Sequence, residues 1–349
     1  MRKETTVLNR VTLAGTPLGR TEALGQSDAF LAFQERLSCV APINRPVLLI
    51  GERGTGKELA ASRLHFLSTR WQSPVIALNC SALTPSLIES ELFGYEKGAF
   101  TGAEQRRTGR FEAAHEGTLF LDEIGNIPVE VQEKILRIVE YGVFERVGSS
   151  DSIEVDVRII AATNADLASL AAEGRFKHDL LDRLSFEVLF LPPLRERKGD
   201  ILLLANHFAG RMALELDREK MPRFGDHAAR ALESYSWPGN VRELKNLVER
   251  ALYRSDSSLI KEIDFNPFHP PFAKNSTAQK PSPVAERPGS SREDALVKTF
   301  HEAVRDLEIR LLKEALEQVK FNQKRAALLL GLSYHQFRGL YRKHKAQIT

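Results

Sequence analysis

The stretch that decides the fold runs from Pro46 to Glu58 and reads Pro-Val-Leu-Leu-Ile-Gly-Glu-Arg-Gly-Thr-Gly-Lys-Glu. Its apolar start predicts a short buried strand, and a helical pattern follows from Glu58 to Ser68. Between them, residues 51–57 fit the pattern G-x-x-x-x-G-K. Glycines let backbone N–H groups curl around phosphate oxygens, the helix N-terminus adds positive potential, and Lys57 would reach the terminal phosphates. The stretch therefore predicts a phosphate-binding loop.

The sequence around this loop repeats the same alternation. Further apolar runs at 75–78, 118–121 and 157–162 are separated by helical stretches. Strands that alternate with helices predict an α/β core, with a parallel sheet covered by helices on both faces. After Pro192-Pro193 the pattern becomes helical. We therefore expect residues 23–265 to form one domain, with the α/β core ending at about 193 and a small helical lid over about 194–265.

A second candidate element of the site is the sequence Leu119-Phe120-Leu121-Asp122-Glu123, where an apolar strand ends in two carboxylates. Asp122 is suited to hold Mg²⁺ and Glu123 to polarise an attacking water. The alternative is a simple cap on a strand-to-helix turn. With the phosphate loop upstream, nucleotide hydrolysis is the stronger interpretation.

Composition limits the class of protein. The chain has 349 residues, of which 42% are hydrophobic, so it is not wholly disordered. It contains no apolar run long enough to span a membrane, and its N-terminus does not resemble a secretory signal. Cys39 and Cys80 lie far apart, which argues against a disulfide framework or a zinc site. These features predict a cytoplasmic protein without membrane insertion.

The charge is distributed unevenly. Residues 320–349 contain seven basic and no acidic side chains, a charge of +7, so residues 1–319 carry −4 of the total of +3. A basic end on a nearly neutral chain indicates contact with nucleic acid. Residues 266–297 are rich in proline and serine and predict a linker. Residues 298–349 then form the basic module.

Within this module, residues 322–344 fit a helix–turn–helix. Ala326 and Ala327 allow two helices to cross closely, Gly331 permits the turn, and Ser333 is suited to cap the second helix. The second helix of this motif enters the major groove of double-stranded DNA. A helical hairpin used only for packing is the alternative. The predicted base-reading residues are Tyr334, His335, Gln336 and Arg338, and the predicted phosphate-contacting residues are Arg342, Lys343 and Lys345.

Residues 91–103 carry the most specific motif, because Gly98-Ala99-Phe100-Thr101-Gly102-Ala103 reads G-A-F-T-G-A. With this motif the sequence resembles the AAA+ activators of sigma-54 RNA polymerase over nearly the whole chain. The resemblance implies that this loop touches the sigma factor, and Phe100 is suited to be an exposed anchor. It also accounts for Glu58, because family sequences often have glutamate there where other phosphate loops have serine or threonine.

The resemblance also implies roles at the nucleotide site. ATP would be bound by the loop residues Gly51, Glu52, Arg53, Gly54, Thr55, Gly56, Lys57 and Glu58. Thr163 and Asn164 match the family's first sensor, and Arg242, in a segment reading W-P-G-N-V-R-E-L, matches the second. Asn79 matches the asparagine that holds the catalytic glutamate, here Glu123, away from water.

One position departs from the family pattern F-R-x-D-L-x-x-R-L, because the first arginine is Lys177 in this chain. Lysine keeps the charge but loses the planar, two-pronged contact with phosphate oxygens. We therefore expect Arg183 to be the arginine finger supplied to a neighbouring subunit, with Lys177 in a supporting role.

The resemblance further implies partners: sigma-54 RNA polymerase holoenzyme, upstream DNA sites, and further copies of the chain in a ring, expected to be a hexamer. Within the family, the sequence is most similar to activators of phage-shock operons, in which no regulatory domain precedes the ATPase. Residues 1–22 are here too few for such a domain. We therefore expect a repressor protein of the phage-shock system to act in trans. Trp71, in a polar segment, is the candidate contact, although a tryptophan folded onto the core would look the same.

Two other functions fit parts of the sequence. A non-catalytic DNA-binding repressor with a degenerate nucleotide fold would need none of Lys57, Asp122, Glu123 and Arg183, which are all present. Another AAA+ remodelling ATPase, such as a helicase loader or unfoldase, would not need the G-A-F-T-G-A motif.

Overall fold

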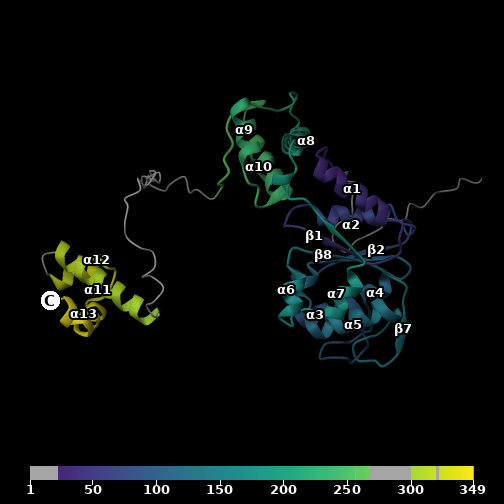
Figure 1. Ribbon diagram of the computed structural model, residues 1–349, viewed down its shortest axis with the longest axis horizontal. Coiled ribbons are helices and arrows are strands. Elements are labelled where there is room, and N and C mark those ends of the chain that lie inside the picture. Colours follow the sequence, from purple (N-terminus) through teal and green to yellow (C-terminus); the bar gives the residue numbers. More distant parts are fainter. Residues whose placement is uncertain (1–22, 256, 268–299, 320–321, 349) are drawn as a thin grey trace, which may run out of the picture. The chain divides into compact units, whose positions relative to one another are not determined.

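A computed structural model describes residues 23–255, 257–267, 300–319 and 322–348 (Figure 1). The chain divides into two compact units, Met1–His269 and Pro270–Thr349. The expected N-terminal extension, and most of the expected linker at 266–297, lie outside the described residues.

The first unit is built on a five-stranded parallel sheet. Its strands, in the spatial order β2-β5-β8-β1-β9, are β2 (Val75–Asn79), β5 (Thr118–Asp122), β8 (Arg158–Thr163), β1 (Val47–Ile50) and β9 (Glu187–Phe190). The predicted α/β fold class is confirmed. The sequence pattern did not reveal β9, which is a short edge strand with Phe190 63% exposed. Its residues Val188 and Leu189 pack toward opposite layers of the sheet, as in the other strands.

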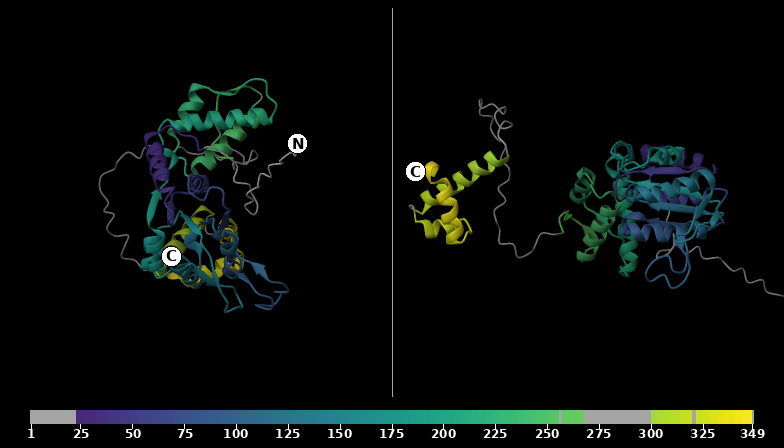
Figure 2. Two further views of the ribbon diagram at one scale, coloured as in Figure 1. Left: turned by 90° about the vertical axis from the view of Figure 1, so that its right-hand side faces the viewer. Right: turned by 90° about the horizontal axis from the view of Figure 1, so that it is seen from below.

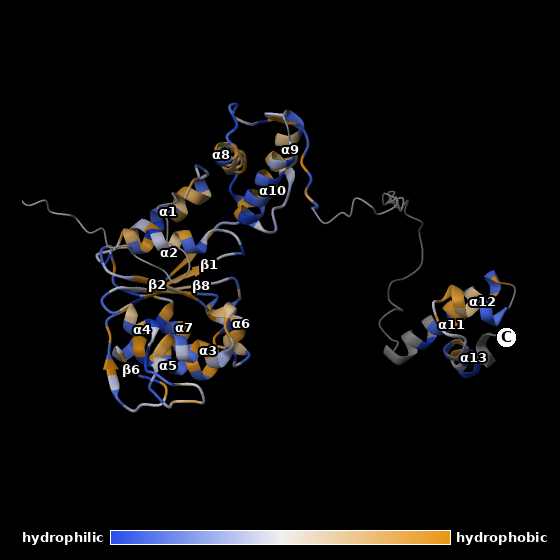
Figure 3. Cartoon of the chain, turned by 180° about the vertical axis from the view of Figure 1, so that it is seen from behind, coloured by the Kyte–Doolittle hydropathy of each residue, from blue (hydrophilic) through white to orange (hydrophobic). Residues whose placement is uncertain are grey.

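Helices cover both faces of the sheet because successive strand residues point to opposite sides. Leu49 and Ile160 pack under α1 (Asp28–Val40) and α2 (Lys57–Phe66), whereas Leu48 and Ile159 face the other layer. That layer contains α3 (Pro85–Phe93), α4 (Arg110–Ala113), α5 (Val129–Tyr141), α6 (Leu167–Ala172) and α7 (His178–Leu184). Figure 3 shows the apolar strands enclosed between helices with hydrophilic outer faces.

The lid contains three helices, α8 (Asp200–Glu215), α9 (Asp226–Ser234) and α10 (Asn240–Arg254). Short strands β10 (Arg223–Phe224) and β11 (Leu259–Ile260) pair beside them. Trp237 is fully buried in this core, and its indole N–H donates to Leu232 O at 2.9 Å. A short 3₁₀ helix, η3 (Leu194–Glu196), leads from the sheet into the lid.

Two hairpins project from the core on the side away from the lid (Figures 1 and 2). One pairs β3 (Gly94–Tyr95) with β4 (Arg107–Thr108), and the other pairs β6 (Val143–Glu145) with β7 (Ser152–Glu154). They are joined by a bridge between Tyr95 and Val147. The remaining 3₁₀ helices are η1 (Cys80–Ala82) and η2 (Ile124–Asn126).

In the described residues of the second unit, the helices are α11 (Phe300–Gln318), α12 (Gln323–Leu329) and α13 (Tyr334–Ile348). Its core includes Leu312 and Leu316 of α11, Ala326 of α12 and Phe337 of α13. The small Ala326 and Ala327 are buried where the helices meet, as close crossing requires. Within the described part of the chain, we find no helix with the length and apolar character to cross a membrane.

Candidate nucleotide site and interaction surfaces

The phosphate loop joins β1 to α2 at the carboxyl edge of the sheet. Gly54 and Gly56 have left-handed backbone angles, with φ of 81° and 101°, which side-chain-bearing residues rarely adopt. The buried Lys57 ammonium donates to Gly51 O at 2.9 Å and lies 3.6 Å from Glu123 Oε1. The loop thus places a positive charge beside a carboxylate at the start of a helix.

The two carboxylates lie where β5 ends. Strand pairing sets Asp122 opposite Asn79, and the Asn79 amide donates to Asp122 Oδ2 at 3.0 Å. Glu123 adopts φ of 54° and accepts from the backbone N–H of Asn164 at 3.3 Å. The expected contact of Asn79 with Glu123 is therefore replaced by one with Asp122. The physical reason is register, since the left-handed turn at Glu123 directs its carboxylate toward β8 instead of β2.

Burial is the main electrostatic influence on this edge. It raises the pKa of Asp122, and the negative charge of Glu123 raises that pKa further, while Lys57 opposes both effects. Burial, followed by the charges of Asp122 and Glu123, also raises the pKa of the Cys80 thiol to about 12, so the thiol stays protonated. Raised pKa values mean that the negative charges at this edge repel one another and lack solvent. A bound cation would therefore stabilise the ionised carboxylates.

A polar cavity of about 320 Å³ brings most of the predicted residues together. Ten of its lining residues, from the phosphate loop, the strand ends and the lid, were predicted from the sequence. The full lining is Arg53, Gly54, Gly56, Lys57, Glu58, Asn79, Ser81, Asp122, Glu123, Asn126, Asn164 and Arg242. The buried Thr163 instead accepts from the backbone N–H of Ala165 at 3.0 Å through its hydroxyl. Ser81 and Asn126 had no signal in the sequence.

Glu52 departs from its expected position. Its carboxylate is not in the lining of the polar cavity but bonds Arg195 and Asn240, at the entrance to the lid. Hydrogen bonds from Arg195, which have the larger influence, and from Asn240 lower the pKa of Glu52 to about 2. The Glu52 side chain thus points to the lid and not into the polar cavity, which does not match its predicted role in binding ATP.

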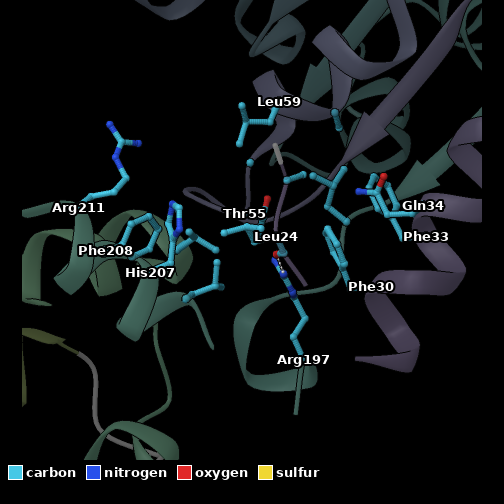
Figure 4. A pocket seen from close by; sticks show the side chains of 16 residues that line it. Leu24, Phe30, Phe33, Gln34, Thr55, Leu59, Arg197, His207, Phe208 and Arg211 are labelled. Atoms are coloured by element: carbon cyan, nitrogen blue, oxygen red, sulfur yellow. Dashed lines mark hydrogen bonds between the residues drawn. The ribbon is translucent and has the colours of Figure 1, made fainter. Parts of the chain in front are cut away.

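A smaller, mainly apolar cavity of about 90 Å³ lies on the other side of the phosphate loop, between α1, α2 and the lid (Figure 4). Phe30 and Phe33 of α1, Leu59 of α2 and Phe208 of α8 line it. The buried Arg197 stacks 4.0 Å from the Phe30 ring centroid and donates to Leu24 O at 2.7 Å. This cavity was not predicted from the sequence, although the apolar spacing of Phe30, Phe33 and Leu37 is typical of a helix with one buried face.

The two candidate finger residues lie away from the polar cavity, on α7 and just before it. Arg183 is 60% exposed and pairs with Glu140 of α5 at 2.8 Å. Lys177 pairs with Glu133, two turns earlier on the same face of α5. Both cations are therefore on the outer surface of the subunit.

The Gly98–Ala103 loop forms the tip of the first hairpin. Gly98 N donates to Ala103 O at 2.8 Å, and both Gly98 and Gly102 have positive φ. Phe100 is 47% exposed and meets the Tyr95 ring edge-on at 4.9 Å. An aromatic side chain is thus presented on a tight turn.

At the base of this hairpin, Arg146 bonds Glu96 at 2.9 Å and Glu112 at 2.7 Å. Arg146 belongs to the β6–β7 hairpin, so its pair with Glu96 ties the two projections together, and its pair with Glu112 ties them to α4 of the core. Trp71 lies elsewhere, after α2, and is 54% exposed. The alternative of a tryptophan folded onto the core is therefore not what the structure has.

In the second unit, a capping box begins α13. The Ser333 hydroxyl accepts from Gln336 N at 3.3 Å, and Gln336 Oε1 accepts from Ser333 N at 3.0 Å. Gly331 has φ of 66° in the turn. Gln336, predicted as a base reader, thus uses its carbonyl oxygen locally.

Of the predicted DNA contacts, Arg338 and Arg342 are exposed, and Tyr334 is 37% exposed. Lys343 is paired with Glu308 of α11 at 3.1 Å, beside the buried His344, which bonds the same carboxylate at 2.8 Å. The side chains of His335 and Lys345 lie outside the described residues.

Protein-family models match all three parts of the chain. Residues 23–189 match the sigma-54 interaction domain, residues 195–282 the AAA+ ATPase lid domain, and residues 303–346 the bacterial regulatory protein, Fis family. The chain belongs to the sigma-54-dependent transcriptional activators, with an AAA+ core of the nucleotide-binding class, its lid and a Fis-type DNA-binding helix–turn–helix.

Individual relatives agree with this assignment. The Psp operon transcriptional activator of Escherichia coli (strain K12) is 51% identical over 329 residues, covering 92% of this chain and 97% of the relative. Regulatory protein AtoC of the same strain is 44% identical over 310 residues, covering 89% of this chain and 65% of AtoC. The crystal structure of NtrX from Brucella abortus in complex with ADP superposes with a TM-score of 0.65 and 32% identity, covering 93% of this chain and 69% of NtrX.

Proposed function

We propose that the protein hydrolyses ATP as a ring and uses the free energy to remodel sigma-54 RNA polymerase closed complexes into open ones. The observation that carries the proposal is the polar cavity, in which Lys57, Asp122 and Glu123 meet Arg242 of the lid. A degenerate site would not be expected to keep a lysine, a carboxylate pair and a lid arginine around one phosphate-sized space.

The two cavities on either side of the phosphate loop suit the two ends of ATP. Backbone N–H groups of the loop and the buried Lys57 would hold the phosphates. The apolar cavity beside Phe30 and Phe208 would take the base, since bases stack on aromatic and aliphatic side chains. The NtrX relative was crystallised with ADP, which supports a nucleotide of this kind.

Asp122 is the residue suited to hold Mg²⁺, because its half-buried carboxylate borders the polar cavity and Asn79 orients it. The cation would neutralise charge that develops on the phosphate oxygens. Glu123 would orient the attacking water and accept its proton. The N–H of Asn164 fixes the Glu123 carboxylate at 3.3 Å, which keeps this group in the cavity.

Arg183 would act on the neighbouring subunit's nucleotide, because it is exposed and lies outside its own subunit's polar cavity. In a ring, a residue on one face serves the site on the opposite face of the next copy. Lys177 would support the same interface. A hexamer is the ring size that the family resemblance implies.

The loop at Gly98–Ala103 would transmit the change in nucleotide state to sigma-54, with Phe100 and Thr101 in contact. The ion pair of Arg146 with Glu96 would make the two hairpins move together, and its pair with Glu112 of α4 would link them to the core. The helix–turn–helix would bind upstream DNA through exposed Arg338 and Arg342.

The similarity to the Psp operon activator supports phage-shock operons as the targets, and a repressor protein acting in trans as the regulator. The exposed Trp71, with Phe66 43% and Leu67 44% exposed nearby in the chain, is the proposed contact.

Promoter opening in a purified system tests the proposal. It requires this protein, sigma-54 polymerase, a suitable promoter, and either ATP or a non-hydrolysable analogue. We expect opening with ATP alone. Hydrolysis without opening would move the protein to another class of AAA+ machine, and the absence of both would favour a non-catalytic repressor.

A further inference from the structure

One acidic side chain, Glu52, lies at the junction between the phosphate loop and the lid. Glu52 receives two hydrogen bonds from the Arg195 guanidinium, one to Oε2 at 2.8 Å and one to Oε1 at 2.5 Å. The Asn240 amide donates to Oε2 at 3.0 Å. Glu52 belongs to the phosphate loop, Arg195 to η3 and Asn240 to the start of α10, so the carboxylate connects three segments.

Asn240 makes this connection specific. It is fully buried and adopts φ of 52°, a left-handed conformation that asparagine tolerates better than most residues. Its carbonyl oxygen accepts from Leu194 N at 2.8 Å, and its amide also donates to Arg53 O at 3.1 Å. Its carbonyl and both amide hydrogens are thereby used in holding the lid entrance against the loop.

The backbones of the two segments also fit closely. A Cβ atom at Gly54 would lie 2.3 Å from Gly239 O, and Arg242 N donates to Gly54 O at 3.3 Å. The loop and the first turn of α10 therefore meet in direct backbone contact at this point. Arg242, two residues beyond Asn240, is also the lid residue that lines the polar cavity.

The Glu52–Arg195 pair is half-exposed, with side chains 40% and 45% accessible. Pairs of this kind add little to folding stability because water screens them and ordering costs entropy. A two-pronged geometry, however, fixes orientation well. The low pKa of Glu52, caused mainly by Arg195, means that this carboxylate stays charged across the physiological range.

We propose that Glu52 is a positioning residue that sets the angle of the lid relative to the phosphate loop, so that Arg242 faces the phosphates, and that it is not a nucleotide ligand. Phosphates that order the loop would then also order the lid through Glu52. This inference rests on the proposed ATP hydrolysis for its catalytic consequence, but the lid geometry can be tested without hydrolysis.

The direct test measures the distance between the core and the lid. Spin labels are attached at Glu130→Cys in α5 and Glu233→Cys in α9, both exposed positions, in a Cys39→Ser background of the full chain. With ADP bound, we expect a narrow distance distribution in otherwise unaltered protein. Glu52→Ala and Arg195→Ala should each broaden it, whereas Glu35→Gln, which removes an exposed charge on α1, should not. An unchanged distribution in both alanine variants would overturn the proposal.

Steady-state kinetics supply a second test. Glu52→Ala should lower kcat by about tenfold, while the Kd for ADP changes by less than about threefold, since the loop backbone and Lys57 remain. The double variant Glu52→Ala/Arg195→Ala should be no worse than either single variant, because both remove the same link. Additive losses, or a Kd increase with Glu52→Ala alone, would identify Glu52 as a nucleotide ligand instead.

The two proposals fail differently. If the wild-type protein does not hydrolyse ATP, the proposed function fails, and the spin-label distances still decide the role of Glu52. If hydrolysis occurs and the distances do not respond to Glu52→Ala, only the positioning role is wrong.

Discussion

Lys57, Asp122 and Glu123 illustrate what can be predicted at the scale of single residues. Their side chains border one cavity because Lys57 follows β1, Asp122 ends β5 and Glu123 comes next, and the carboxyl ends of these parallel strands lie at the same edge of the sheet. The hydrogen-bond partner of each polar side chain was harder to predict from the sequence. Asn79 bonds Asp122 because β2 and β5 are neighbours in register, and Glu52 turns to the lid because Arg195 and Asn240 approach it in space.

A pair of variants tests whether Arg183 serves the neighbouring subunit. Glu123→Gln should lower ATP hydrolysis by at least about a hundredfold, and Arg183→Ala by about a thousandfold. An equal mixture of the two inactive proteins should regain activity. Random mixing places an intact Glu123 beside an intact Arg183 at about a quarter of the interfaces.

The control for this experiment is a mixture of Glu130→Gln and Arg183→Ala. Its activity should come only from interfaces at which a Glu130→Gln subunit supplies the intact Arg183. A mixture of Glu123→Gln and Arg183→Ala without any recovery would mean that both residues act in the same subunit. Losses from Lys177→Ala equal to those from Arg183→Ala would contradict the division of roles between the two cations.

At the scale of elements, the hairpin tip at Gly98–Ala103 combines a flexible turn with an exposed aromatic ring. The family resemblance predicted a loop that touches the sigma factor, but the ion pair of Glu96 with Arg146, which joins this loop's hairpin to the β6–β7 hairpin, arises only when two distant segments fold side by side. Separation of the tip from the polar cavity allows contact with a partner to be changed without changing hydrolysis.

Thr101→Ala should therefore retain ATP hydrolysis within about twofold of wild type while losing promoter opening, because no residue that lines the phosphate cavity is altered. Ser150→Ala, an exposed change in the companion hairpin, is the matched control and should keep both activities. A Thr101→Ala protein that still opened promoters would remove the loop from the mechanism.

The contact between α2 and β5 predicts a pH dependence of stability. His65 of α2 is fully buried, and its Nδ1 lies 2.9 Å from Thr118 Oγ1 of β5. Burial, with a smaller effect of the Arg158 charge, lowers the pKa of His65 from 6.5 to about 4. The folded state therefore favours the neutral ring, and stability is complete above pH 6.5 and is lost as the pH falls toward 4.

We expect the free energy of unfolding of the first unit to fall by up to roughly 3 kcal/mol over this window. Urea unfolding followed by tryptophan fluorescence reports on this unit, since both tryptophans, Trp71 and Trp237, belong to it. His65→Gln should flatten the pH dependence between pH 6.5 and 4. The same slope in this variant would assign the effect to other groups.

At the scale of the whole molecule, the chain combines a nucleotide-binding unit with a separate helical unit. The second unit has its own buried core around Phe337 and Leu316, so its described helices bury their apolar side chains against one another. This separation predicts that the two activities can be divided.

A chain that ends at Ser290 should keep ATP hydrolysis and lose sequence-specific DNA binding. Loss of the basic helix–turn–helix should also remove the steep decrease of DNA affinity with salt, because released counterions come from phosphates contacted by lysine and arginine. Footprinting and a salt titration of DNA affinity measure this. A shortened protein that still protected its operator would contradict the division.

Local chemistry was determined by the sequence alone: the phosphate loop, the carboxylate pair at a strand end, the G-A-F-T-G-A motif and the basic helix–turn–helix are each contiguous, and their residue types define their chemistry. Only the tertiary structure decided which side chains meet across the chain. It joined Glu52 to Asn240, 188 positions apart, and Arg158 to the end of α1, and it built an apolar cavity from α1, α2 and α8. The reason is that periodicity and motifs report on neighbours along the chain, whereas strand order and helix packing set neighbours in space.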